Sequence, residues 1–177
     1  GAAMSESPPI IRRATEADLK AINEIYNDEV LHRVASWDYE AWSIDQRRQW
    51  LDHHDSDATT PVFVAELDGE VAGMSYLSWY RPRPGYTFTR ENTVYIDARF
   101  HRRGLGGLLL GALIESARAN ELRTLIAVIE SSNEGSIALH ARFGFEQVGL
   151  LRDVGFKFDG WLDSVYMQLR LPESGEG

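Results

Sequence analysis

The sequence predicts a mixed α/β fold, an α+β arrangement in which helices pack on a sheet of parallel and antiparallel strands. Segments with the apolar spacing of strands alternate with segments of helical spacing, in the order β-α-α-β-β-β-α-β-α-β-β. Asp68-Gly69 and Asp159-Gly160 are typical of hairpin turns, which join antiparallel strands. Two β-α-β passages in the second half favour parallel pairing there.

The length of the chain indicates one domain. It has 177 residues, and we expect the domain to occupy residues 10–172. Gly1-Ala2-Ala3 before Met4 looks like a cloning scar. We therefore expect a scar and flexible N-terminus over residues 1–9 and a flexible tail over residues 173–177.

Charge and composition exclude several functions. The chain has 18 Lys and Arg against 27 Asp and Glu, and its net charge of -9 argues against nonspecific binding to nucleic acids or anionic membranes. Because cysteine is absent, there is no disulfide framework, thiolate nucleophile or cysteine-based zinc site. No apolar run reaches the ~20 residues of a membrane span, and no signal peptide is visible, so we expect a cytoplasmic protein.

Two capping boxes predict where the helices of the first half begin. Thr15 with Asp18, and Ser43 with Gln46, have the spacing at which two side chains cap a first turn reciprocally. An aromatic loop that includes Trp37 separates these helices. The expected elements are a strand over 10–13, a helix from 15 to about 32, a helix from 43 to about 54, a surface loop over 55–60, and a hairpin with strands over 61–67 and 70–80.

Strands and helices alternate in the second half. Asn133 or Ser132 can cap a short helix, which Gly144 ends. The other expected elements are a strand over 92–97, a helix over 107–119, a strand over 122–129 buried on both faces, and a final hairpin with strands over 145–157 and 161–171.

The most informative segment is Arg102-Arg103-Gly104-Leu105-Gly106-Gly107, between a strand and a helix. Its glycines allow a tight turn that presents successive backbone N–H groups, and the helix N-terminus adds about half a positive charge. Both effects suit a pyrophosphate, and a glycine-rich turn without any ligand is the alternative. The pattern is neither a P-loop nor the dinucleotide fingerprint, because Leu109 stands where the third glycine is required.

Several motifs, in order, resemble the GNAT acetyltransferase superfamily. They are Val94-Tyr95-Ile96, the loop from His101 to Gly106, Asn133 with Ser136 and His140, and Gly144-Phe145. The resemblance implies a GNAT-like acyl-CoA N-acyltransferase fold with acetyl-CoA as co-substrate. It also implies that the loop holds the pyrophosphate of acetyl-CoA, with His101 at the Gln/Arg position of the signature [QR]-x-x-G-x-[GA].

The match extends to one branch, the phosphinothricin and methionine sulfoximine N-acetyltransferases, from about Ile11 to Leu171. This branch acetylates the amine of a small amino acid or amino-acid analogue, and its resemblance also implies a homodimer. The motifs that carry it are Ile25-Tyr26-Asn27, Arg81-Pro82, the segment from Glu91 to Ile96, the segment from Asn133 to His140, and the segment from Lys157 to Asp163. The implied acetyl-CoA contacts are Val94, Tyr95, Ile96, Arg102, Arg103, Gly104, Leu105, Gly106, Gly107, Asn133 and Ser136.

Two residues are candidates for catalysis. An amine is mostly protonated at pH 7, so a base is useful, and the resemblance gives this role to Glu91, acting through water. A solvated carboxylate at the end of a strand is the alternative. His140 matches the position from which this branch approaches the sulfur of coenzyme A, where imidazole can position or protonate a leaving thiolate. A packed structural histidine is the alternative there.

An acceptor site is expected before and within the strand that carries Glu91. Arg81 and Arg83 precede this strand, and arginine forks suit carboxylates. With Trp37 from the aromatic loop, they could frame a small zwitterion, or the aromatic side chain could serve packing instead. The substrate-binding candidates are Arg81, Pro82, Arg83, Glu91, Asn92, Thr93 and Trp37.

Other functions remain open in the sequence. Within the same class, the acceptor could be a polyamine or a protein N-terminus, although a polyamine site would be rich in carboxylates. In other classes, the chain could be a noncatalytic acyl-CoA-binding sensor or a nucleotide-binding regulatory domain. We expect no metal, because His53 and His54 point apart on a helix and are assigned to its solvated end.

Overall fold

A computed structural model describes residues 7–173, which form a seven-stranded sheet in the order β1-β2-β3-β4-β5-β7-β6. The strands are β1 (Ile10–Arg13), β2 (Val62–Leu67), β3 (Glu70–Trp79), β4 (Thr89–Ile96), β5 (Thr124–Glu130), β6 (Glu146–Lys157) and β7 (Gly160–Arg170). The helices are α1 (Leu19–His32), α2 (Ile44–Asp55), α3 (Leu105–Ala119) and α4 (Glu134–Arg142). The mixed α/β fold class is confirmed. The expected scar at residues 1–3 and residues 174–177 of the expected tail lie outside the described residues.

The sheet is antiparallel except at its centre. β4 pairs with β5 in parallel, as the passage through α3 predicts. The second parallel pair expected from the sequence is wrong, because β7 lies between β5 and β6 and pairs antiparallel with both. The tight turn at Asp159-Gly160 brings β7 back beside β6, and β7 then takes the place next to β5.

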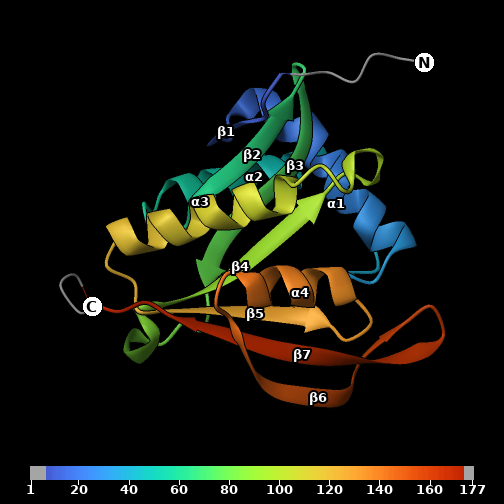
Figure 1. Ribbon diagram of the computed structural model, residues 1–177. Helices are drawn as coiled ribbons and strands as arrows, with labels where there is room; N and C mark the ends of the chain where they lie inside the picture. Colours follow the sequence, from blue (N-terminus) through green and yellow to red (C-terminus); the bar gives the residue numbers. More distant parts are fainter. Residues whose placement is uncertain (1–6, 174–177) are drawn as a thin grey trace.

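The helices cover both faces of the sheet (Figure 1). α1 and α2 lie on one face over a core that includes Ile22, Val64 and Met74. α3 packs on the opposite face through Leu110 and Leu113, which lie in a second core with Leu125 of β5. Since these side chains have almost no exposed surface, the sheet is a rigid frame between two apolar layers.

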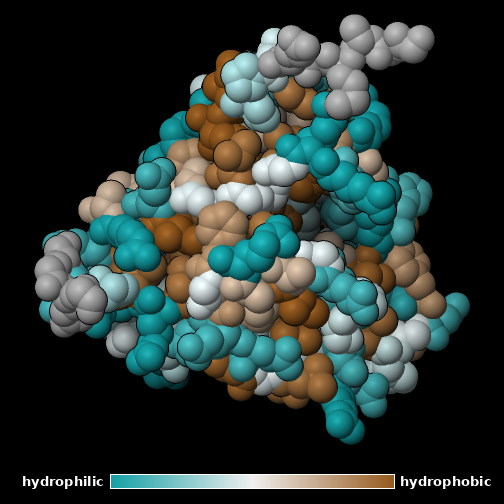
Figure 2. Space-filling model, in the orientation of Figure 1, coloured by the Kyte–Doolittle hydropathy of each residue, from teal (hydrophilic) through white to brown (hydrophobic). Residues whose placement is uncertain are grey.

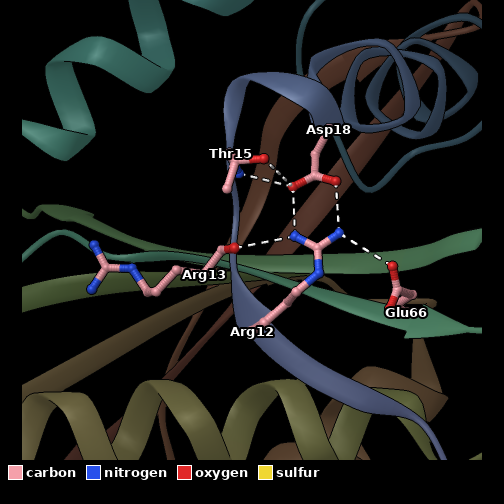
Figure 3. Close-up of polar contacts among 5 residues, drawn as sticks. All are labelled: Arg12, Arg13, Thr15, Asp18 and Glu66. Atoms are coloured by element: carbon pink, nitrogen blue, oxygen red, sulfur yellow. Dashed lines mark hydrogen bonds and ion pairs between the residues drawn. The ribbon is translucent and has the colours of Figure 1, made fainter. Parts of the chain in front are cut away.

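Both predicted capping boxes are present. The backbone N–H of Thr15 donates to the Asp18 carboxylate at 2.8 Å, and the Gln46 N–H donates to Ser43 Oγ at 3.1 Å. A single 3₁₀ turn (Glu16–Asp18) precedes α1. The Asp18 carboxylate also accepts hydrogen bonds from both terminal guanidinium nitrogens of Arg12, at 2.8 and 2.9 Å (Figure 3). This ion pair links the start of the first helix to β1. This contact lowers the pKa of Asp18.

Three local expectations need correction. β4 begins at Thr89 rather than at residue 92, because Arg90 is buried, stacks 4.0 Å from the Trp79 ring and donates to two backbone carbonyls. α3 begins at Leu105, directly after Gly104 with its φ of 74°. His54 is not solvated: it is buried, and its Nδ1 lies 3.0 Å from the Thr60 carbonyl oxygen.

Hydrophilic and hydrophobic residues both contribute to the surface, and hydrophobic residues are exposed beside α3 (Figure 2). Ile11, Phe63, Leu108 and Phe143 border a shallow groove there. Within residues 7–173, no helix has the length and apolarity that crossing a bilayer requires. The same residues contain no group of three or more histidine and acidic side chains placed to hold a metal ion.

Candidate functional site

The two central strands separate after a short paired stretch. Glu91 and Ile126 form the last pair in the register of β4 with β5. Beyond this pair the arrowheads of β4 and β5 point in different directions, and α4 follows β5 (Figure 1). The side chains from Asn92 to Tyr95 and from Ala127 to Glu130 line a cavity of about 240 Å³ at this separation, which we call the central cavity.

A second cavity, of about 520 Å³, opens beside the glycine-rich loop, and we call it the loop cavity. Gly104 has a φ of 74° and Arg102 a φ of 65°, so the chain turns sharply before the first turn of α3. All the residues expected to contact acetyl-CoA line this cavity: Val94, Tyr95, Ile96, Arg102, Arg103, Gly104, Leu105, Gly106, Gly107, Asn133 and Ser136. A helix N-terminus with several basic side chains nearby suits a phosphate group.

A third cavity, of about 450 Å³, also has Glu91 in its lining, and we call it the aromatic cavity. Its lining includes Trp37 and Tyr39 from the loop after α1, together with Arg81. Gly155 and Phe156 of β6 line the same space. Glu91 lines both the central and the aromatic cavity, and Asn133 lines both the central and the loop cavity. The three cavities therefore follow one another along the separation of β4 and β5.

Glu91 is the carboxylate at the junction of these spaces. Burial raises its pKa, and the positive charge of Arg81 opposes that increase. A partly buried carboxylate with a raised pKa can accept a proton at neutral pH more readily than an exposed one.

His140 is buried in α4, and both ring nitrogens have partners. Its Nδ1 lies 2.7 Å from the Ser136 carbonyl oxygen, and its Nε2 lies 3.0 Å from Asn92 Nδ2. The ring packs edge-on against Phe145, with ring centroids 4.9 Å apart. Burial lowers the pKa of His140, so the ring is neutral at neutral pH.

The loop after α1 covers the aromatic cavity as a roof, and contacts with β6 hold the loop and the end of α1 in place. Tyr39 donates a hydrogen bond from its hydroxyl to the Phe156 carbonyl oxygen. The buried ammonium of Lys157 donates to the Ser36 carbonyl oxygen at 2.7 Å and to the Glu29 carbonyl oxygen at 3.2 Å. Trp37 lies so close to Gly155 that a methyl group at that glycine would overlap the indole ring. These contacts fix the position of the roof.

Most of the expected acceptor residues line the cavities. Trp37, Arg81 and Glu91 line the aromatic cavity, while Asn92 and Thr93 line the central one. Pro82 and Arg83 are exposed and lie outside these three cavities, as far as the described residues show. Asn133 caps α4 by accepting from the Ser136 N–H at 3.1 Å, as its capping alternative predicts, and it also lines the loop cavity.

Comparison with known families gives one clear result. Residues 11–166 match the family described as "Acetyltransferase (GNAT) domain". The chain belongs to the GNAT acetyltransferase family. The GNAT assignment confirms the resemblance seen in the sequence.

Similar proteins place the chain more closely within the GNAT family. An L-methionine sulfoximine/L-methionine sulfone acetyltransferase of Pseudomonas aeruginosa is 41% identical over 161 residues, covering 91% of this chain and 94% of that protein. A crystal structure of a GNAT phosphinothricin acetyltransferase from Sinorhizobium meliloti in complex with AcCoA is 35% identical, with a TM-score of 0.90 and coverage of 96% and 91%. A crystal structure of a ribosomal-protein-alanine N-acetyltransferase from Brucella melitensis is 43% identical, with a TM-score of 0.89 and coverage of 92% and 99%.

Sequence reasoning missed several residues of this GNAT site. Gly155 makes room for Trp37, but a single glycine inside a strand gives no signal of what approaches it. Arg142 lines the loop cavity from the end of α4, and Tyr76 lines the central cavity from β3. Tyr76 reaches this cavity because it pairs with Thr93 in the register of β3 with β4, and the sequence pattern does not give this pairing.

Proposed function

We propose that this chain transfers the acetyl group of acetyl-CoA to the amine of a small amino acid or amino-acid analogue, of the methionine sulfone, methionine sulfoximine or phosphinothricin type. The observation that carries this proposal is the position of Glu91 between two spaces of different character. Glu91 lines the central cavity, which shares Val94, Tyr95 and Asn133 with the loop cavity and its helix N-terminus. It also lines the aromatic cavity, together with Arg81.

The loop cavity fits acetyl-CoA. The sharp turn at Gly104 leaves the first backbone N–H groups of α3 available to the pyrophosphate, and Arg102, Arg103 and Arg142 add positive charge at the rim. Bound there, acetyl-CoA supplies an acetyl group already activated as a thioester. Tyr95 and Ile96 of β4 line the loop cavity, and their backbone N–H groups are candidates to bind the thioester carbonyl oxygen and the pantetheine arm of acetyl-CoA.

Glu91 removes the proton of the acceptor amine, directly or through water. The raised pKa of the Glu91 carboxyl matches this role, since a base works best with a pKa nearer to the operating pH. The amine nitrogen then attacks the thioester carbonyl carbon directly, the carbon–sulfur bond breaks, and coenzyme A leaves as a thiolate that takes its proton from solvent. No acetyl-enzyme is expected, because the chain contains no cysteine and the two substrates meet in one continuous space.

Arg81 holds the carboxylate of the acceptor. It lines the aromatic cavity with Glu91, and its charge acts on Glu91 across that space. A zwitterion can place its carboxylate at Arg81 while its amine faces Glu91. The roof through Trp37 and Tyr39 encloses a space suited to a small molecule.

A second candidate acceptor is a protein N-terminus. It is favoured by the similarity to the ribosomal-protein-alanine N-acetyltransferase of Brucella melitensis. A peptide has no carboxylate beside its terminal amine, so it would leave Arg81 without a partner. The roof would also have to open for the rest of a peptide chain.

We further propose a homodimer in the cytoplasm. β6, the turn after it and the start of β7 expose several large apolar side chains that a second subunit could cover: Val148, Leu150, Leu151, Val154, Phe156, Phe158 and Trp161. Light scattering at micromolar concentration should give the mass of two chains, and a monomeric mass would refute this. Fractionation of cells should recover the protein in the cytoplasmic fraction, and recovery in another fraction would refute the proposed location.

The function itself is tested by a thiol-release assay with acetyl-CoA and a panel of amines. The panel contains methionine sulfone, methionine sulfoximine, phosphinothricin, a polyamine and an alanine-initiated peptide. The proposal expects rapid release of coenzyme A with the first three and slow release with the last two. A preference for the peptide would identify the second candidate, and binding of acetyl-CoA without turnover of any amine would indicate a sensor.

A further inference from the structure

Asn92 has one polar atom without a partner in a place where it can meet a substrate. It follows Glu91 on β4, at the point where β4 leaves β5, and lines the central cavity. The residue is 5% exposed. Nδ2 lies 3.0 Å from His140 Nε2, whereas Oδ1 is buried and has no hydrogen-bond partner among the described residues. A buried amide oxygen that remains unpaired is costly, which suggests a partner in the working enzyme.

The orientation of this amide follows from His140. The Ser136 carbonyl oxygen lies 2.7 Å from His140 Nδ1 and can only accept, so Nδ1 carries the ring proton. In the neutral ring, Nε2 is then an acceptor. It receives the Asn92 Nδ2 hydrogen, and this contact turns Oδ1 away from His140.

We propose that Asn92 Oδ1 accepts an N–H hydrogen bond from a substrate in the central cavity, and that His140 is the positioning residue that sets the Asn92 amide. Oδ1 is a pure acceptor, so it cannot stabilise a thiolate, and an N–H group is the chemistry it fits. Two N–H groups can reach this cavity in the proposed function, on which this inference rests. They are the amine of the acceptor and an amide of the pantetheine arm of acetyl-CoA.

This assignment differs from a role of His140 as proton donor to the leaving thiolate. A donor would need its proton on Nε2 and a free path to the sulfur. Here the proton is on Nδ1 and directed at a backbone carbonyl, and Asn92 occupies the Nε2 side. His140 as a whole is also only 3% exposed.

The first experiment determines the tautomer in the protein without turnover. Long-range ¹H–¹⁵N NMR of the full chain, with and without coenzyme A, identifies which ring nitrogen of His140 carries hydrogen. The inference expects a proton on Nδ1 and none on Nε2 at neutral pH. A proton on Nε2, or on both nitrogens, would overturn it. Because this readout does not depend on activity, it stands even if the proposed acceptor is wrong.

The second experiment compares two substitutions of His140. In His140→Gln, the side-chain oxygen can still accept from Asn92 Nδ2, whereas His140→Phe keeps an aromatic ring without an acceptor. We expect kcat/KM to fall about tenfold in His140→Phe and much less in His140→Gln. Equal losses in both variants would indicate lost proton donation instead and overturn the inference. Circular dichroism and thermal unfolding check that both variants fold.

The third experiment identifies the source of the N–H. Asn92→Leu keeps the size of the side chain and removes its polar atoms. If the acceptor amine is the partner, its KM rises about tenfold and the calorimetric Kd of coenzyme A is unchanged. If the pantetheine amide is the partner, the Kd of coenzyme A rises instead. Unchanged values of both would overturn the inference, as would a double variant Asn92→Leu with His140→Phe whose losses simply add.

Discussion

The loop cavity and the aromatic cavity are built in different ways. The loop cavity takes a continuous run of its lining from residues 100–107. The pyrophosphate contacts that we propose there are backbone N–H groups of that one turn. The aromatic cavity is assembled from Trp37, Arg81, Glu91 and Gly155, which belong to four separate parts of the chain. A site made by one segment is visible in that segment, whereas a site made by packing depends on contacts between distant residues. A substitution can therefore disable the loop cavity or the aromatic cavity while leaving the other one intact.

The largest effect is expected from Gly106→Asp in the loop cavity. A Cβ at Gly106 would lie 3.1 Å from Leu139 Cδ2, and the new carboxylate would face the pyrophosphate. We expect the calorimetric Kd of coenzyme A to rise by at least about 100-fold. Gly85→Asp is the matched control, because it adds the same charge where a Cβ meets nothing within 4 Å. Similar affinity in both variants would mean that the pyrophosphate binds elsewhere.

The next largest effect is expected at Glu91, which lines both the central and the aromatic cavity. Glu91→Gln should lower kcat about 100-fold and leave the Kd of coenzyme A nearly unchanged. Since burial raises the pKa of Glu91, the wild-type rate should fall on the acid side at a higher pH than an exposed glutamate would give. This fall should disappear in the variant, and part of the activity should return at high pH, where the amine loses its proton unaided. Full activity of Glu91→Gln at pH 7 would exclude Glu91 as the base.

A smaller effect is expected in the aromatic cavity from Gly155→Ala. The added methyl would displace the Trp37 ring and disturb the roof. We expect the KM of the acceptor to rise about tenfold, with no change in the KM of acetyl-CoA. Gly149→Ala in the same strand is the control, because its Cβ would lie 4.0 Å from the Tyr166 Cβ, an ordinary contact. If the two alanine variants behave alike, Trp37 does not shape the acceptor site.

The fold was predictable wherever local signals decide it. Capping side chains marked the helix starts at Thr15 and Ser43, and the turn at Asp68-Gly69 marked a hairpin. The position of β7 between β5 and β6 was not predictable in this way, because strand order depends on long-range pairing that no local pattern encodes. The start of β4 was missed for a related reason. Arg90 reads as a surface residue, yet its stacking on Trp79 buries it.

The same distinction applies to the site. Every residue expected at the glycine-rich loop lines the loop cavity, since the positions are consecutive and share one turn. Arg81 and Arg83 could not be separated by sequence, because which arginine faces Glu91 depends on the path of an irregular segment. The pairing of His140 with Asn92 could not be predicted either, since it joins two elements that only the fold brings together.

The most direct test of this account asks whether Arg81 recognises a carboxylate. Wild type and Arg81→Ala are compared on methionine sulfone and on the amine that remains when methionine sulfone loses its carboxylate. Removing Arg81 also removes a charge that lowers the pKa of Glu91, so both rates are measured at a pH where Glu91 is ionised in both proteins. The account predicts that the KM for methionine sulfone rises about 10- to 100-fold while the KM for the simple amine hardly changes. An equal rise of KM for both substrates would contradict it and would indicate that Arg81 only stabilises the loop in which it lies.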